Sequence, residues 1–183
     1  RDHGRDARTQ LRVPHPRPRP LARVHGRLTT AVVELVAGRI DDPDAAVLVG
    51  ALLEDLAGRY GGRDAFHPDP RSLAPPDGVF VLARLDGVPV GCGGFRRFAD
   101  GVAEIKRMYV APEARRGGVA TAVLEDLETR ARALGYRSIR LETGTNQPEA
   151  MALYQRAGYR AMVPYGHYRD SPMSRCFEKD LGP

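Results

Sequence analysis

A glycine-rich segment, Arg115-Arg116-Gly117-Gly118-Val119-Ala120-Thr121, stands at the start of an amphipathic pattern that predicts a helix. Small residues there leave backbone amides uncovered at the positive end of the helix dipole, an arrangement that suits a pyrophosphate. No Gly-Lys-Ser/Thr follows, so the segment is not a Walker loop, and Gly91-Cys92-Gly93-Gly94 does not complete a dinucleotide fingerprint. The segment predicts a phosphate site; the alternative is that Gly117 and Gly118 only allow close helix packing.

A second pattern lies downstream, where Asn146, Ala150, Tyr154 and Gly158 follow one another at intervals of four residues. Together with the spacing Arg115-x-x-Gly118-x-Ala120, it resembles the GNAT family of acetyl-CoA-dependent N-acetyltransferases. The family's loop pattern is Arg or Gln, two residues, Gly, one residue, then Gly or Ala. The resemblance covers residues 78–160 by motif and 28–181 by the order of elements.

The resemblance implies a GNAT fold of the α/β (α+β) class, a mixed and mostly antiparallel twisted sheet flanked by helices. It also implies direct transfer of the acetyl group of acetyl-CoA, without a metal, to a primary amine of a small molecule such as an amino acid. One alternative is a non-catalytic CoA-binding regulatory module. Another is acetylation of a protein N-terminus or lysine.

The resemblance assigns the cosubstrate contacts residue by residue. The backbone of the strand end would bind the pantetheine arm, at a splay between two strands, and loop amides would hold the pyrophosphate. Arg115 or Arg116 would lie near the phosphates or the adenosine, and Asn146 would line the channel. The residues concerned are Met108, Tyr109, Val110, Arg115, Arg116, Gly117, Gly118, Val119, Ala120, Thr121 and Asn146.

The resemblance also implies that Tyr154 is the catalytic acid, near the sulfur of the thioester. A tyrosine pKa of about 10 is close enough to a thiol pKa of about 8.5 for the hydroxyl to protonate a departing thiolate. The alternative is a core tyrosine, since Ala150 and Tyr154 share a helix face.

The general base is less clearly marked. Glu104 is the first candidate, because a glutamate on this strand is the base in several GNAT relatives. Glu142 is the second, although it could simply pair with Arg140, and water is the third.

Residues for the acceptor are also predicted. Alternation places Lys106 and Arg107 on opposite faces of their strand, where one could bind an acceptor carboxylate; the alternative is pairing with Glu104. Tyr165 lies in a loop, residues 164–172, that would line the amine site or contact a partner in a homodimer.

These residues need a series of short elements to position them. Strands are predicted at residues 30–36, 78–85, 88–98, 102–110 and 138–143, with further strand material at 159–162 and 175–181. Helices are predicted at residues 45–60, 115–134 and 148–157. The turns Asp86-Gly87 and Asp100-Gly101 join three strands into an antiparallel meander before a strand-helix-strand-helix order begins.

The charge is concentrated at one end. Residues 1–23 contain seven arginines and two aspartates, so they carry the whole net charge of +5. Alternating prolines at residues 14–20 favour a disordered leader over residues 1–26, ahead of a single domain at residues 27–183. The alternative is a tether for nucleic acid, whereas the motifs favour neither nucleic acid nor membrane as partner.

Two cysteines and no apolar stretch of membrane-spanning length favour a cytoplasmic protein. No Cys/His spacing suits a metal.

Overall fold

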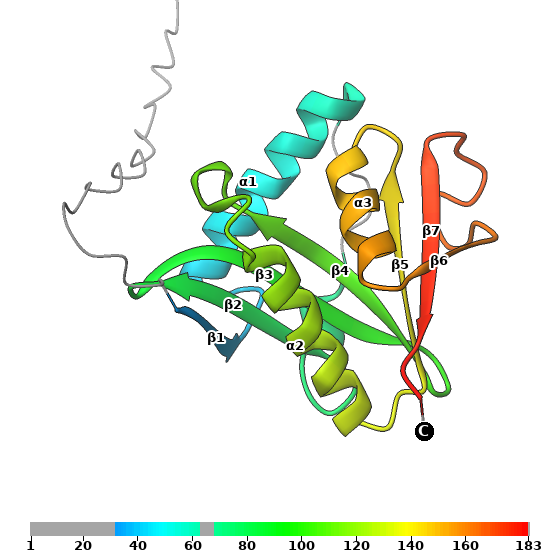
Figure 1. The fold of residues 1–183 in the computed structure, drawn as a ribbon, viewed down its shortest axis with the longest axis horizontal. Helices are drawn as coiled ribbons and strands as arrows, with labels where there is room; N and C mark the ends of the chain where they lie inside the picture. Colours follow the sequence, from blue (N-terminus) through cyan, green and yellow to red (C-terminus); the bar gives the residue numbers. More distant parts are fainter. Residues whose placement is uncertain (1–31, 63–67, 183) are drawn as a thin grey trace, which may run out of the picture. The chain divides into compact units, whose positions relative to one another are not determined.

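Within residues 32–62 and 68–182, which the computed structural model describes, seven strands form one sheet in the order β1-β2-β3-β4-β5-β7-β6 (Figure 1). Neighbouring strands are antiparallel except β4 and β5, which are parallel. The strands are β1 (Val33–Gly38), β2 (Val79–Leu85), β3 (Val88–Ala99), β4 (Val102–Val110), β5 (Ser138–Gly144), β6 (Arg160–Met162) and β7 (Ser174–Asp180). The sheet confirms the mixed, mostly antiparallel α/β prediction.

The first strand differs from its prediction at residues 30–36, since β1 ends at Gly38. Its register with β2 pairs Val33 with Leu85 and Gly38 with Phe80, so cross-strand pairing sets the boundary. Residues 30 and 31, like the predicted leader at 1–26, lie outside the described residues.

Three α-helices are described in the same ranges: α1 (Pro43–Tyr60), α2 (Val119–Ala133) and α3 (Pro148–Arg156). Short 3-10 turns occupy η1 (Pro70–Leu73) and η2 (Pro112–Ala114). Helix α2 begins at Val119 and not at Arg115, as predicted, because Arg116 and Gly118 have φ angles of 63° and 82°. These left-handed angles are incompatible with a right-handed helix, so residues 115–118 form a loop.

The helices cover the two faces of the sheet separately. Alternation along β2 directs Val81 and Ala83 to one core, which contains the apolar faces of α2 and α3. Phe80 and Leu82 point to the other core, which α1 and η1 cover. We call these the α2-side and α1-side faces. The sheet therefore separates Tyr154, which is in the α2-side core, from side chains on the α1-side face.

The glycines of β3 permit close packing of α2. A Cβ atom on Gly93 would lie 2.9 Å from Met108 Cγ and 3.0 Å from Val123 Cγ1. Both distances are too short for a side chain, so α2 rests nearly on the backbone of β3. The run at residues 91–94 is thus a packing feature, in agreement with its failure to match a dinucleotide fingerprint.

Strand β4 contains a bulge. Between the pairs Cys92–Tyr109 and Gly94–Lys106, two steps along β3 face three along β4. The extra residue permits a φ angle of 59° at Arg107. It also reverses the alternation of β4: Ile105 and Met108, three residues apart, both contact the α2-side core. The prediction that alternation places Lys106 and Arg107 on opposite faces therefore does not hold across the bulge.

Candidate functional site

The parallel strands β4 and β5 separate at one end. Their pairing ends at Ile105 opposite Leu141, although β4 continues to Val110 and β5 to Gly144. A cavity of about 1130 Å³ lies at this splay and is lined by both strands, by α1 and α3, and by the start of α2. Beyond Ile105, the β4 edge that faces β5 has no partner strand among the described residues, so its backbone groups can bind an extended ligand.

The loop before α2 supplies the second part of the site. Gly118 is the N-cap and offers no side chain to the first turn, so the amides of Val119, Ala120 and Thr121 have no acceptor within the helix. The first turn contains no acidic residue. Positive φ angles at Arg116 and Gly118 further turn backbone amides toward one side, as in anion-binding nests. Loop and helix dipole together suit a phosphate group.

Arg115 is anchored at the end of β4. Its Nε donates to the carbonyl of Val110 at 3.0 Å, and its guanidinium lies 5.8 Å from the centre of the Tyr109 ring. Arg116 also lines the cavity. The loop therefore places two cations beside the uncovered amides.

Tyr154 reaches the cavity from α3. Its side chain is 6% exposed, and burial alone raises its pKa to about 12. The hydroxyl donates to Met108 Sδ over 3.9 Å, a long contact with a weak acceptor. The hydroxyl is therefore protonated at neutral pH and available to a stronger acceptor in the cavity.

Comparison with known proteins agrees with this geometry. A profile of the Acetyltransferase (GNAT) family matches residues 49–159. An IAA acetyltransferase from Azospirillum brasilense is 41% identical over 140 residues, which cover 75% of this chain and 92% of that protein. The chain belongs to the GNAT acetyltransferase family. It is therefore an acetyl-CoA-dependent N-acetyltransferase.

Solved structures show the same GNAT fold. An acyl-CoA N-acyltransferase structure from Klebsiella pneumoniae is 29% identical with a TM-score of 0.70, covering 81% of this chain and 97% of that one. A GNAT acetyltransferase from Elizabethkingia anophelis, solved with acetyl-CoA bound, has 18% identity and a TM-score of 0.60 over 81% of this chain and 97% of its own. At that identity the second likeness concerns the fold alone.

Most residues predicted for the GNAT site line the cavity. They are Lys106, Arg107, Met108, Tyr109, Val110, Arg115, Arg116, Gly118, Val119, Ala120, Thr121, Glu142 and Tyr154. Four predicted residues are not among its lining residues: Glu104, Gly117, Asn146 and Tyr165. Gly117 remains part of the loop between Arg116 and Gly118, whereas the other three have contacts of their own.

Glu104 is enclosed in ion pairs. Its side chain is 2% exposed and lies 2.7 Å from Arg96 and 2.9 Å from Lys106. Both of its oxygens thus face a cation, and the side chain does not line the cavity. Pairing with Glu104 was the predicted alternative for Lys106, and the structure contains this ion pair.

Tyr165 packs beside the same charged region. Its ring lies 5.1 Å from the Phe98 ring, at an angle of 74°, and 5.1 Å from the guanidinium of Arg140. Arg140 in turn donates to Glu178 at 2.8 Å. Burial raises the pKa of Tyr165. The side chain packs beside Arg140 and is not among the residues that line the cavity.

Glu142 lines the cavity from β5, one residue after the strand pairing ends. It accepts a hydrogen bond of 2.6 Å from the hydroxyl of Ser174 on β7. Of the two predicted base candidates, Glu142 is the one at the cavity. Sequence reasoning missed Ser174, because its distance from Glu142 along the chain gives no local signal.

A clasp joins α1 to the β5–α3 connection; we use the term for Arg59, Tyr60, Asn146 and Glu149. Arg59 donates to the Asn146 carbonyl at 2.7 Å and pairs with Glu149 at 2.6 Å. The Asn146 amide side chain donates to the Arg59 carbonyl at 2.7 Å, and the Asn146 N–H donates to Tyr60 Oη at 3.2 Å. The side chain of Asn146 thus holds α1, in place of the channel lining predicted for it.

The clasp lies beside the cavity, since Arg59, Tyr60 and Glu149 are among its lining residues. Desolvation is the largest single influence on Glu149 and opposes its charge, but the hydrogen bonds from Arg59 and from the backbone, together with the charges of Arg59 and Arg115, outweigh it and lower the pKa of this carboxyl. Sequence reasoning missed α1 as part of the site, because its helical pattern indicates only an amphipathic helix.

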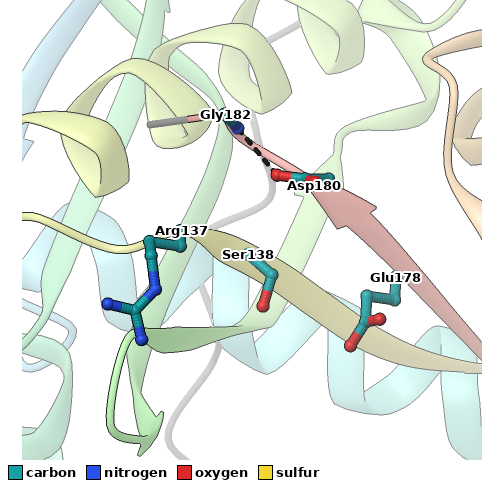
Figure 2. A pocket seen from close by; sticks show the side chains of 5 residues that line it. All are labelled: Arg137, Ser138, Glu178, Asp180 and Gly182. Carbon is teal, nitrogen blue, oxygen red and sulfur yellow. Dashed lines mark hydrogen bonds between the residues drawn. The ribbon is translucent and has the colours of Figure 1, made fainter.

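A second cavity, of about 450 Å³, lies at the other end of β5 and β7 (Figure 2). It is lined by Arg137, Ser138, Glu178, Asp180 and Gly182, and Asp180 accepts a hydrogen bond from the Gly182 N–H at 2.8 Å. Asp180 and Glu178 already accept hydrogen bonds from other residues of the chain, and no residue of the GNAT motifs lines this cavity.

Within residues 32–62 and 68–182, the structure gives no evidence of a metal site, a membrane-spanning helix or a reactive cysteine. No cluster of three or more His, Cys, Asp or Glu there could hold a metal ion. In the same ranges no helix has the length and apolar character that a bilayer requires. Cys92 is a core thiol, whose burial raises its pKa to about 12.

Proposed function

We propose that this GNAT enzyme transfers the acetyl group of acetyl-CoA directly to the primary amine of a small molecule that also carries a carboxylate, such as an amino acid. Acetyl-CoA and acceptor would be bound together in a ternary complex. The observation that supports this choice is the distribution of charge at the splay. Strand β4 contributes Lys106 and Arg107 to the cavity, whereas β5 contributes Glu142.

The charges on β4 favour an anionic group. Glu104 pairs with both Arg96 and Lys106, and Arg107 adds a third basic side chain to this side of the splay. A carboxylate would bind on this side of the splay, while the amino group of the same acceptor would lie beside Glu142.

The cavity also suits acetyl-CoA. The pyrophosphate would bind the amides of Val119, Ala120 and Thr121, with Arg116 beside them. The pantetheine arm would follow the unpaired β4 edge toward Val110. The thioester would then lie between Tyr154, from the α2-side face, and Glu142.

The reaction would proceed by attack of the neutral amine on the acetyl carbonyl carbon. A backbone amide near Val110 stabilises the oxyanion, and Glu142 accepts the proton that the amine loses. As the C–S bond breaks, the sulfur receives a hydrogen bond and then a proton through Tyr154. The products are an amide and the CoA thiol, and exchange with water restores both side chains.

The acceptor class is tested with matched pairs of amines. Amino acids and their decarboxylated counterparts are compared by release of the CoA thiol, alongside polyamines, aminoglycosides and peptide N-termini. We expect lower KM for the amino acid of each pair. The Arg107→Asn variant, which keeps a residue tolerant of positive φ, should raise KM roughly tenfold for the amino acid but not for its decarboxylated partner.

Preference for the decarboxylated amines would contradict the proposed acceptor. Turnover of none of the amines would contradict small-molecule acetylation and favour a regulatory module or a protein substrate. Arg107→Gly serves as a second variant, because it removes the charge and relieves the backbone strain at the bulge.

A further inference from the structure

Ser174 is a buried hydroxyl fixed at the wall of the cavity. Its side chain is 5% exposed and lies on β7, where its backbone pairs with Gly144 of β5. Its N–H donates to the Ser171 carbonyl at 3.1 Å, and the neighbouring Met173 carbonyl accepts from the Thr145 N–H at 2.8 Å. These backbone bonds hold Ser174 rigidly against the open end of β5.

The hydroxyl of Ser174 is directed at Glu142. Its proton is donated to Glu142 Oε1 at 2.6 Å, and its oxygen lies 3.8 Å from Cys176 Sγ. An ionised carboxylate only accepts hydrogen bonds, so the serine must be the donor to it. The short distance is typical of a bond from a hydroxyl to a charged oxygen.

This bond restricts what the carboxylate can do. A glutamate side chain has several rotatable bonds, and a base that moves among rotamers is seldom aligned with the proton it accepts. With Oε1 held by Ser174, Oε2 has a fixed place. Ser174 and Glu142 both line the cavity, so the fixed oxygen is beside the space available to the acceptor.

We propose that Ser174 is a positioning residue that fixes the Glu142 carboxylate for proton removal from the acceptor amine. The inference rests on the proposed function, in which Glu142 is the base. In this inference Ser174 contacts Glu142 and takes no direct part in the transfer. Its effect on the rate must therefore pass through Glu142.

The experiment compares Ser174→Ala, Ser174→Thr, Glu142→Gln and the double variant Ser174→Ala/Glu142→Gln in the full chain. Release of the CoA thiol gives kcat and KM with the best acceptor. Removing a hydrogen bond to a charged group should lower kcat roughly tenfold in Ser174→Ala, with KM for acetyl-CoA unchanged, and Ser174→Thr should recover most of the rate. Ser138→Ala, on the same sheet but away from the splay, is the control.

The double variant supplies the decisive comparison. Glu142→Gln should lower kcat at least a hundredfold. If Ser174 acts through Glu142, adding Ser174→Ala to Glu142→Gln changes the remaining rate by less than about twofold. A full tenfold further loss would overturn the inference and make Ser174 a structural residue.

The other outcomes separate the two proposals. No turnover by the unaltered chain overturns the proposed function. Normal turnover by Glu142→Gln overturns Glu142 as base and the role of Ser174 with it. If Ser174→Ala keeps a normal kcat while Glu142→Gln has a strongly lowered kcat, only the inference about Ser174 is overturned. Thermal unfolding and acetyl-CoA binding are measured for each variant to detect a folding defect. If Ser174→Ala is misfolded, its place in the comparison is taken by Ser174→Thr.

Discussion

Burial determines what Tyr154 can contribute as a single residue. Its pKa of about 12 is well above the ordinary thiol value of about 8.5. Complete proton transfer to a free thiolate is therefore less favourable than the unperturbed tyrosine pKa suggests. The hydroxyl is best suited to donate a strong hydrogen bond while negative charge develops on the sulfur.

The raised pKa of Tyr154 gives a pH prediction. Because the hydroxyl stays protonated until the pH approaches 12, kcat should not decline between pH 8 and 10 through loss of this proton. Tyr154→Phe should lower kcat roughly a hundredfold, with acetyl-CoA affinity nearly unchanged. Stopped-time assays of CoA thiol release from pH 6 to 10 check both statements. An alkaline decline present in the unaltered enzyme and absent in Tyr154→Phe would contradict this assignment.

At the scale of elements, the bulge in β4 and the clasp on α1 act on the same splay. The bulge adds one residue to β4 beside β3, and the β4–β5 pairing ends just before it. The clasp then ties α1 to the connection after β5 through Arg59 and Asn146. The bulge therefore lies where the two strands begin to separate, and the clasp connects α1 to the segment between β5 and α3.

The clasp predicts a kinetic effect of Arg59→Met. This change removes the pair with Glu149 and the bond to Asn146 while keeping most of the aliphatic stem. We expect KM for acetyl-CoA to rise roughly three- to tenfold, because α3 and the splay lose a fixed spacing. Steady-state kinetics measure the change.

Arg39→Met is the matched control for Arg59→Met. Arg39 pairs with Asp41 at the exposed surface before α1, where an ion pair contributes little. Equal KM values for the two variants would contradict a role of the clasp in acetyl-CoA binding.

For the whole molecule, the basic pI of about 9.6 does not reflect the charge balance of the domain that contains the site. The surplus charge belongs to residues 1–23, whereas the rest of the chain has equal numbers of acidic and basic residues. Beside the cavity the basic side chains include Arg107, Arg115 and Arg116, which belong to the domain and not to residues 1–23.

This separation predicts how the full chain responds when the seven arginines of residues 1–23 are replaced by glutamine. Acetyl transfer should keep its kcat/KM within twofold, and any binding to nucleic acid should disappear. Fluorescence anisotropy with DNA and RNA at several salt concentrations measures the second effect, since phosphate contacts make affinity salt-dependent. Salt-dependent binding by the substituted chain would place a nucleic-acid surface on residues 24–183.

The amino-acid sequence by itself determined the order of the elements and the small-residue loop before α2. Both depend on local features: apolar periodicity, the turns Asp86-Gly87 and Asp100-Gly101, and the small residues before Val119. Such features act within a few residues, so they are readable along the chain. Tyr154 was predicted from the resemblance of residues 146–158 to the GNAT motif, and the structure places it at the cavity.

The tertiary structure alone decided which carboxylate faces the cavity and what holds it. Glu104 and Glu142 both read as strand residues. Register brings Arg96 beside the first, which Lys106 of the same strand also contacts, and it brings Ser174 beside the second. The clasp likewise joins residues 87 positions apart. Cross-strand register and the bulge in β4 depend on the packing of the whole sheet, and no local pattern encodes them.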